Sequence, residues 1–486
     1  MRDRWRRTTM PRGAARMLRL AVPALVLACE HAPSGPGASV SSVTIATAAV
    51  DLAQGQTYCF SAHVAASGGT DRSVTWRARH GLHNGSMDAD GCYEADSVGT
   101  DTIIAASTVD PGTTAIVTVT IRPADPWPLA AMTDLALPTY DGSGQAIHPS
   151  ELTACPVRSR WRYRTAVTPY PYLKSNYENP SVFVSSDQRH WVLQPGTPNP
   201  LVMPGTATQT SAVGKTRYYT GLPAPAWSTL SDPDFVCDSV GHAVRLYFRQ
   251  IGDSAEYILY MQSRGDSNWS PPQTVMVAHP EAGGEMISPS FVYLQQAWRA
   301  WFVRGACGAT SSEVRTSVST DGTTGFSDPE TVDIEQAGYV IWHLQVRAFA
   351  GALWMLYSAY PNTVDKCYAG DLFLARSDDG RSWSTFEQPV LNHLDYPQFE
   401  AGLYRSSMLY DSASDVLTVQ VSGYYSQGTQ LAAATGTIRF GFTQLLSGLT
   451  PAAGATVRPR AREPRLAAPF HSPLSDGEAR GFLVDD

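Results

Sequence analysis

The sequence predicts an all-β protein whose larger part is a five-bladed β-propeller. Four segments share one pattern, in which an acidic residue opens an extended run and a Ser/Asp turn leads to an aromatic residue 12 or 13 positions later. These segments are Glu178–Trp191, Glu256–Trp269, Glu313–Phe326 and Asp371–Trp383. A fifth, weaker unit runs from Tyr404 to Phe440. Repeats of this length that contain short strands are typical of propeller blades.

A short polar signature precedes each copy by 24 to 30 residues. The signatures are His148-Pro149-Ser150, Asp232-Pro233-Asp234, Ser288-Pro289-Ser290 and Trp342-His343-Leu344, and the fifth unit begins with Tyr404-Arg405-Ser406. Each signature leads into a predicted first strand, and an aromatic second strand, a third strand at the acidic residue and an outer edge strand follow. Because first strands line the axis of a propeller, we expect the signatures to meet there.

Composition excludes several classes of protein. Of the 486 residues, 16% are charged and the formal net charge is -8, so no basic field is available to hold nucleic acid. No run of 18 apolar residues occurs, so we expect no membrane-spanning helix. The chain is long enough for two or three domains with their own cores.

The first 28 residues have the pattern of an export signal. Seven arginines lie between Arg2 and Arg19, and an apolar stretch follows them and ends at Ala28. The sequence Val26-Leu27-Ala28-Cys29 resembles the lipobox of bacterial lipoproteins, which implies that Cys29 is lipidated and anchors an exported protein to a membrane surface. The alternative is an ordinary cleaved signal with Cys29 nearby.

The other six cysteines are expected to form disulfides, because an even number in an exported chain favours them. We expect Cys59 to pair with Cys92 inside one domain. We expect bridges between neighbouring blades for the pairs Cys155–Cys237 and Cys307–Cys367, whose members occupy similar places in their repeats. Metal binding is the alternative, although no Cys-x-x-Cys pair supports it.

Domain boundaries follow from composition and strand pattern. Residues 29–41 are a predicted flexible tether, and residues 42–122 alternate polar and apolar residues in short predicted strands. Residues 42–122 resemble a bacterial Ig-like domain of group 2 in Gly55-Gln56-Thr57, Val74-Thr75-Trp76, Asp90-Gly91, Val98–Ile103 and Ala115–Val119. The resemblance implies an Ig-like β-sandwich that serves as a spacer or adhesive module. The propeller is predicted over 123–445, and 446–486 is expected to be disordered.

The turn Ser377–Trp383 resembles the Asp-box of sialidases. In such a turn the Asp caps main-chain amides and the aromatic residue plugs the blade, so we assign these turns a structural role.

The signatures should bring carboxylates, imidazoles and a guanidinium into one concave site, as polar substrates such as sugars require. We expect His148, Asp232, Asp234, Ser288, His343 and Arg405 there, with Trp342 beside them. Tyr177, Glu178 and Asn179 join from a neighbouring strand. We assign no residue to a metal site and expect no cofactor, although a central structural cation is compatible with the pattern. Each histidine could equally be a satisfied structural residue, and Arg405 could be an ion-pair partner between blades.

Residues 145–440 resemble the five-bladed propeller glycosidases of the glycoside hydrolase family 43 clan. The resemblance rests on the five signatures, on Thr168-Pro169-Tyr170-Pro171 and on Tyr177-Glu178-Asn179-Pro180. It implies that Asp232 is the general base, with Asp234 second. Ser288 and Trp342-His343-Leu344 depart from the clan, because they stand where a tuning Asp and an acidic Glu would be expected.

A substitute general acid is expected at Glu178, with Glu285 as the alternative. A Glu buried beside aromatic residues would have a raised pKa, as an acid requires. The alternative for Glu178 is a structural role like that of the other repeated acids. The sequence therefore predicts an exported, lipid-anchored protein that hydrolyses a glycan by acid/base chemistry. A non-catalytic glycan-binding or adhesion protein is the first alternative and a sialidase-like enzyme the second.

Overall fold

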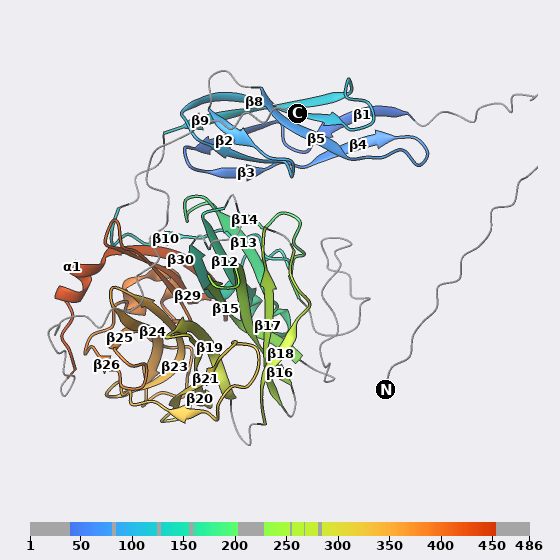
Figure 1. The fold of residues 1–486 in the computed structure, drawn as a ribbon. Helices are drawn as coiled ribbons and strands as arrows, with labels where there is room; N and C mark the ends of the chain where they lie inside the picture. The colour runs from blue at the N-terminus through green and yellow to red at the C-terminus, as the bar shows by residue number, and fades with distance from the viewer. Residues whose placement is uncertain are drawn as a thin grey trace, which may run out of the picture.

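The computed structural model describes residues 39–452, except for 80–83, 124–127, 154, 156–158, 160, 203–227, 253–254, 267 and 280–283. It confirms the predicted all-β class and the propeller (Figure 1). The predicted signal with Cys29 and the first part of the tether lie outside the described residues, as does most of the predicted tail.

Four blades are regular four-stranded antiparallel sheets. Their strands, from the axis outward, are β11 (Ala146–Thr153) to β14 (Val192–Leu193), β15 (Ser228–Asp238) to β18 (Gln273–Ala278), β19 (Gly284–Leu294) to β22 (Glu330–Thr331), and β23 (Tyr339–Phe349) to β26 (Ser384–Thr385). The strands between them are β12 (Tyr163–Pro169), β13 (Ser181–Ser185), β16 (Ala243–Gly252), β17 (Glu256–Ser263), β20 (Ala297–Gly305), β21 (Glu313–Ser319), β24 (Ala352–Pro361) and β25 (Asp371–Ser377). Three third strands begin at the predicted acidic residue, whereas Glu178 lies three residues before β13.

The fifth blade closes the ring with strands from both ends of the domain. Its inner part is β27 (Gly402–Leu403) and β28 (Ser407–Asp411), followed by β29 (Val416–Gln427) and β30 (Gln430–Gly441). The outermost strand is β10 (Thr133–Asp134), which precedes the first blade in sequence and pairs with β30. From the sequence alone, the Pro-containing segment 124–139 is predicted to be a linker that leads into the first blade. Closure by an early strand ties the last blade to the first and covers a sheet edge.

The chain continues beyond 445, the expected end of the propeller. The short helix α1 (Phe442–Ser447) packs Phe442 on Trp354. Farther on, Thr450 and Ala452 make main-chain hydrogen bonds to Glu387 and Thr385.

The described part of the N-terminal β-domain contains three small sheets. The first pairs β1 (Val40–Ile45) with β4 (Ala62–Ala66), and the second has the order β2 (Ala49–Ala53), β9 (Thr114–Arg122), β8 (Gly99–Ser107) and β5 (Val74–Arg79). The third has the order β3 (Thr57–Cys59), β7 (Cys92–Ala95) and β6 (Gly85–Met87). Its relation to Ig-like domains stays a prediction. The β-domain lies beside the first blade, with β3 near β14 (Figure 1).

The first strands of four blades carry a bulge at the signature, where pairing with the second strand shifts register. In the first three blades the bulge residues have a left-handed main chain, with φ of 55° at His148 and 52° at Asp232 and Ser288. This conformation costs a non-glycine residue about 1–2 kcal/mol. Bulges re-aim side chains, and these turn the signature residues toward one another on the axis.

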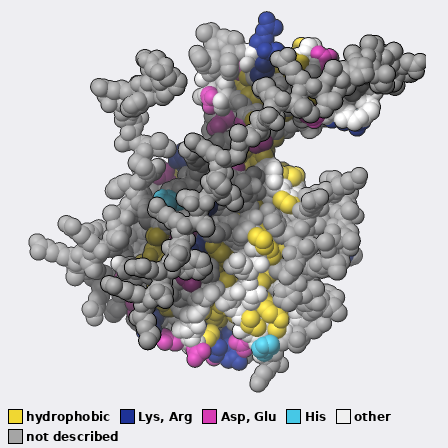
Figure 2. Space-filling model, turned by 45° about the vertical axis from the view of Figure 1, so that its right-hand side comes forward, with side chains coloured by type: hydrophobic (Ala, Val, Ile, Leu, Met, Phe, Trp, Pro, Cys, Tyr) yellow, Lys and Arg dark blue, Asp and Glu magenta, His cyan; other side chains and the backbone are white. Residues whose placement is uncertain are grey.

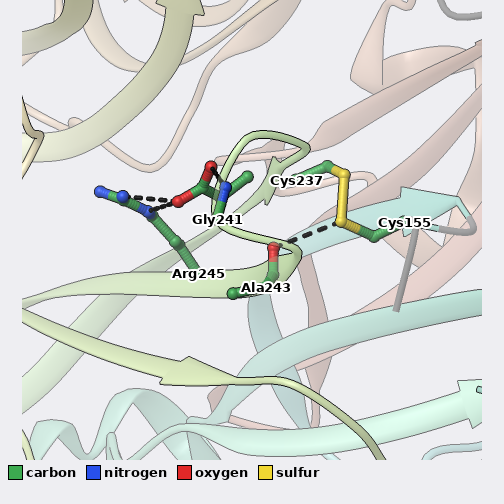
Figure 3. Close-up of a disulfide and its surroundings, with 6 residues drawn as sticks. Cys155, Cys237, Gly241, Ala243 and Arg245 are labelled. Carbon is green, nitrogen blue, oxygen red and sulfur yellow. Dashed lines mark hydrogen bonds and ion pairs between the residues drawn. A yellow bond between two sulfur atoms is a disulfide. The ribbon is translucent and has the colours of Figure 1, made fainter. Parts of the chain in front are cut away.

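All three predicted disulfides are confirmed: Cys59–Cys92, Cys155–Cys237 and Cys307–Cys367. Figure 3 shows the bridge that joins Cys155 after β11 to Cys237 in β15. The adjoining turn is held by Asp238, which accepts hydrogen bonds from the Gly241 amide and the Arg245 guanidinium. The first-strand ends of the first two blades are therefore joined covalently.

On the face shown in Figure 2, the described acidic and basic side chains are interspersed at the lower edge. These described residues form no continuous basic surface there. Within the described ranges, no helix has the length and apolar character needed to cross a membrane.

Candidate functional site

Four signature residues from four blades meet on the propeller axis. His148 of β11 places Nε2 3.5 Å from Oδ1 of Asp232, and His343 of β23 places Nδ1 3.3 Å from the same oxygen. Ser288 of β19 contacts both partners, with its hydroxyl 3.1 Å from Asp232 Oδ1 and 2.7 Å from His343 Nδ1. All four side chains are almost fully buried. The predicted convergence of these residues is therefore present.

Burial and neighbouring charges set the protonation of this cluster. Burial alone would raise the pKa of Asp232, but the His148 and His343 rings and Arg405 outweigh it and hold that pKa well below its usual value. Burial lowers the pKa of His148 to about 3 and also lowers the pKa of His343. At neutral pH the cluster therefore contains an anionic carboxylate and two neutral imidazoles.

Each imidazole is held through Nδ1, whereas its Nε2 atom makes no hydrogen bond within the described residues. His148 Nδ1 lies 3.0 Å from the Thr168 hydroxyl, and His343 Nδ1 is the atom that meets Ser288. Both Nε2 atoms are buried and lack a hydrogen-bond partner among the described residues. One ligand atom from each of His148, Asp232 and His343 can be chosen so that the three lie within 4.8 Å of one another. Two neutral imidazoles with hydroxyl partners and a carboxylate are a donor set that divalent zinc and similar metals favour.

Glu178 lies on the other side of the His148 ring, with Oε2 3.7 Å from Nδ1. Burial raises the pKa of Glu178 well above its usual value, and the Asp232 charge adds to the rise. The acids at the same repeat position have other partners: Glu256 binds Arg249, Glu313 contacts Arg315, and Asp371 contacts His393. Among the four, Glu178 is the one that contacts the signature residues on the axis, and its raised pKa favours the protonated carboxyl.

The His148 ring lies between the two predicted catalytic carboxyl groups. The distances on its two sides, 3.7 Å to Glu178 and 3.5 Å to Asp232, place the carboxyl groups within about 10 Å of each other. A separation below this upper limit is one condition for a two-carboxylate mechanism. However, the imidazole occupies the space where inverting hydrolysis would need a water molecule and a sugar.

Aromatic side chains form one wall of the site. The Tyr404 ring is 4.1 Å from the His343 ring and 5.3 Å from the His148 ring, centroid to centroid. Trp342 packs edge-on against His343 and directs its indole N–H to the Tyr404 hydroxyl at 3.4 Å. Tyr170 and Tyr424 continue the wall. Such faces suit stacking against a sugar ring.

Tyr177 and Asn179 lie beside Glu178 and are held by Tyr140. The Tyr140 hydroxyl donates to the Tyr177 carbonyl at 2.8 Å and accepts from the Asn179 amide at 2.9 Å. The Asn179 Oδ1 atom is buried without a hydrogen-bond partner in the described chain. Their assignment to substrate binding stays a prediction.

Asp234, the second predicted carboxylate, lies one step farther along β15 and belongs to a different network. It accepts hydrogen bonds from the Phe291 amide at 2.8 Å and from the Arg347 guanidinium at 3.0 Å, and Ser150 and Ser290 contact it as well. A catalytic role for Asp234 stays a prediction, but these contacts supply a structural one.

Two residues that the sequence reasoning did not assign to the site also contribute. Arg249 of β16 lies 3.8 Å from Asp232 Oδ2 and is held in place by Glu256 at 2.5 Å. Thr168 of β12 holds His148. The sequence does contain a signal for Arg249: it lies in a predicted second strand, seven residues before the repeated acidic residue Glu256. The alternative acid Glu285 instead contacts Arg304 and Arg315.

No protein-family model matches the chain, and no curated protein matches its sequence. Solved structures do resemble it. An N-acetylgalactosamine deacetylase from F. plautii, in complex with blood group B trisaccharide, has a TM-score of 0.55 and 19% identity over 66% of this chain and 97% of its own. An endo-arabinanase of glycoside hydrolase family 43 from Bacillus licheniformis has a TM-score of 0.40 and 12% identity over 61% of this chain and 93% of its own.

By their names, the two structural neighbours act on glycans, one as a deacetylase and one as an endo-arabinanase. At these identities the similarity establishes the fold, and the chemistry has to be argued from the site itself.

Proposed function

We propose that this protein is an exported glycan-processing hydrolase in which His148, Asp232 and His343 hold a divalent cation, and that it removes an acyl group from a glycan. One observation carries the proposal: two buried, neutral imidazoles leave their Nε2 atoms unpaired beside an ionised carboxylate. Leaving two such nitrogens unsatisfied costs about 1–3 kcal/mol each, so a bound group that uses them would recover this energy.

The chain supplies the other requirements of hydrolysis. A divalent cation bound by such ligands lowers the pKa of a coordinated water and polarises a carbonyl. Glu178 is placed to deliver a proton to the departing amine or hydroxyl of the glycan, because burial raises its pKa and so favours the protonated form. Tyr404 and Trp342 exclude water from the imidazoles and provide a face for the sugar.

Two features favour an acyl group over a glycosidic bond as the reacting group. The His148 ring lies between the carboxyl groups, and the side chains of the site are almost fully buried, which favours the approach of a small acyl group over that of a whole sugar ring. The F. plautii neighbour is a deacetylase of an amino sugar, and this reaction belongs to the proposed class.

A two-carboxylate glycosidase, with Asp232 as base and Glu178 as acid, is the second candidate. The opposite pKa shifts of the two carboxyl groups favour it, because such a pair supplies one base and one acid at the same pH. Both candidates use glycans as partners.

Export and lipid anchoring are part of the proposal. They rest on residues 1–29 and on the three disulfides, which are typical of an oxidising compartment.

The test measures two products from one set of reactions. The purified protein is treated with EDTA, reloaded with Zn²⁺, Mn²⁺ or Ca²⁺, and incubated with N- and O-acetylated glycans and with unsubstituted arabinan and xylan. We expect acetate release that EDTA abolishes and a divalent ion restores. His343→Ala should remove it, and Glu178→Gln should lower it about 10²–10⁴-fold, whereas Glu313→Gln, at the same repeat position on the surface, should leave it unchanged.

The other outcomes separate the alternatives. Release of reducing sugar that is insensitive to EDTA would overturn the metal proposal in favour of the glycosidase. Retention of a glycan without either product would identify a binding protein.

A further inference from the structure

Arg405 is fully buried on the axis, directly beneath the site. Its guanidinium reaches three main-chain carbonyls on three different blades: Pro233 at 2.5 Å, Pro289 at 3.4 Å and Leu344 at 3.5 Å. Each of these residues directly follows a site residue, namely Asp232, Ser288 and His343. One side chain therefore contacts the same main-chain position in the second, third and fourth blades.

These carbonyls lie where the inner strands are strained. Asp232 and Ser288 have φ of 52°, and the pairing of β23 shifts just before His343. A carbonyl fixed one residue away restricts the main-chain angles that the bulge residue can adopt. Because left-handed conformations are disfavoured for Asp and Ser, the bulges need a partner that holds them.

Arginine has the right chemistry for this task. Its planar guanidinium offers five N–H donors in a fixed arrangement, whereas lysine offers three on a single nitrogen. The charge is balanced by Asp234, whose Oδ1 lies 3.7 Å from Nη2. The main chain of Arg405 is fixed as well, because its carbonyl accepts a 2.6 Å hydrogen bond from the Ser422 hydroxyl.

We propose that Arg405 is the positioning residue of the site: it holds the bulges that place Asp232, Ser288 and His343 around the axis and does not itself contact the substrate. This inference rests on the proposed function, because the site that Arg405 would preform is the one proposed to bind a divalent cation. It gives Arg405 a different role from the predicted one in substrate binding.

Arg347 provides a matched control. Its guanidinium contacts the same Asp234 carboxylate, at 3.0 Å, but its carbonyl partners are Val346 and Phe235, which do not directly follow His148, Asp232, Ser288 or His343. Losing either arginine weakens the Asp234 network. Of these two, only Arg405 bonds to the carbonyls behind the site.

The experiment compares Arg405→Ala, Arg405→Lys and Arg347→Ala with the wild type in the full chain. Binding of Zn²⁺ and Co²⁺ is measured by titration, with the Co²⁺ absorption spectrum as a report on ligand geometry. We expect Arg405→Ala to lose at least tenfold in affinity and to change the spectrum, Arg405→Lys to recover part of the loss, and Arg347→Ala to stay within about threefold. Equal losses for Arg405→Ala and Arg347→Ala, or unchanged binding in Arg405→Ala, would overturn the inference.

Two further measurements keep the result interpretable. If Arg405→Ala does not fold, Ser422→Ala loosens only the Arg405 main chain and should cause a smaller fall in affinity; unchanged affinity there would overturn the inference. Hydrogen exchange of the metal-free proteins tests the positioning independently of any cation. Peptides covering 231–236 and 341–347 should exchange faster in Arg405→Ala but not in Arg347→Ala. A wild type that binds no cation, with this exchange pattern intact, would contradict the proposed function and leave the positioning role standing.

Discussion

Glu178 and Asp232 are both buried carboxyl groups, yet their surroundings move their pKa values in opposite directions. Asp232 faces two imidazoles and Arg405, whereas burial and the Asp232 charge dominate at Glu178. Their difference follows from neighbours that lie on other blades. Glu151 is a further buried carboxyl group, outside the site, and here burial is the main cause of the pKa shift, although Oε1 accepts a 2.6 Å hydrogen bond from Gln188.

Glu151 should make the stability of the protein depend on pH. Burial raises the pKa of Glu151 to about 8, against 4.5 for an exposed Glu. Below pH 4.5 both folded and unfolded chains carry the proton, so stability is unaffected. Between pH 4.5 and 8 only the unfolded chain loses it, and stability falls by up to about 1.4 kcal/mol per pH unit. Above pH 8 both chains are deprotonated, and the free energy of unfolding falls no further from this group.

Glu151→Gln should remove this slope, because the amide does not titrate. We expect the variant to gain stability relative to the wild type as the pH rises from 5 to 8, measured by urea unfolding at each pH. Gln188→Ala is the control for the hydrogen bond, and it should keep the slope. Parallel pH profiles for Glu151→Gln and the wild type would contradict the prediction.

At the level of elements, the bulged first strands combine two roles. They pair with the second strands and also turn His148, Asp232 and Ser288 inward. One covalent bridge supports the first two of them from outside the site. The Cys155–Cys237 disulfide joins the strands that carry His148 and Asp232 across a separation of 82 residues.

Replacing both Cys155 and Cys237 by Ser should lower the free energy of unfolding by about 4 kcal/mol, because the bridge restricts a long loop in the unfolded chain. Urea unfolding under non-reducing conditions measures the loss. The matched variant replaces Cys307 and Cys367, which close 60 residues, and we expect a loss of similar size. A double variant as stable as the wild type would show that the bridge adds nothing to stability.

At the level of the whole molecule, two contacts bind distant parts of the chain together. The two residues of β10 complete the fifth blade. In the β-domain, Cys59 and Cys92 pack with Trp161, Val184 and Val192 of the first blade, and the Thr57 hydroxyl lies 3.0 Å from that of Ser186. The β-domain is therefore docked on the propeller, where the sequence suggested a spacer.

Thr133→Pro should weaken the ring closure, because proline removes a donor from the β10–β30 ladder. We expect a loss of about 1–3 kcal/mol in urea unfolding and, since the β30 edge becomes available, self-association that rises with concentration. Thr133→Ala, which keeps the main-chain donor, should lose much less. If the proline and alanine variants unfold alike, the β10 closure does not stabilise the ring.

Particular residues show how far sequence reasoning reached. The repeat pattern placed His148, Asp232, Ser288 and His343 on one axis, because a propeller turns equal repeat positions into neighbours in space. It did not reveal Arg249 as a partner of Asp232, since that contact depends on where a second-strand side chain points. It also missed β10, because two residues are too few to show a strand period.

The sequence by itself determined the all-β class, the propeller repeats, the cysteine pairs and the residues that line the axis, because these follow from periodicity and position in a repeat. Only the tertiary structure decided what those residues can do. The neutral imidazoles, the ionised Asp232, the raised pKa of Glu178 and the carbonyls held by Arg405 arise from burial and from contacts between blades. Charge state and orientation depend on neighbours from distant parts of the chain, and a linear pattern does not specify them.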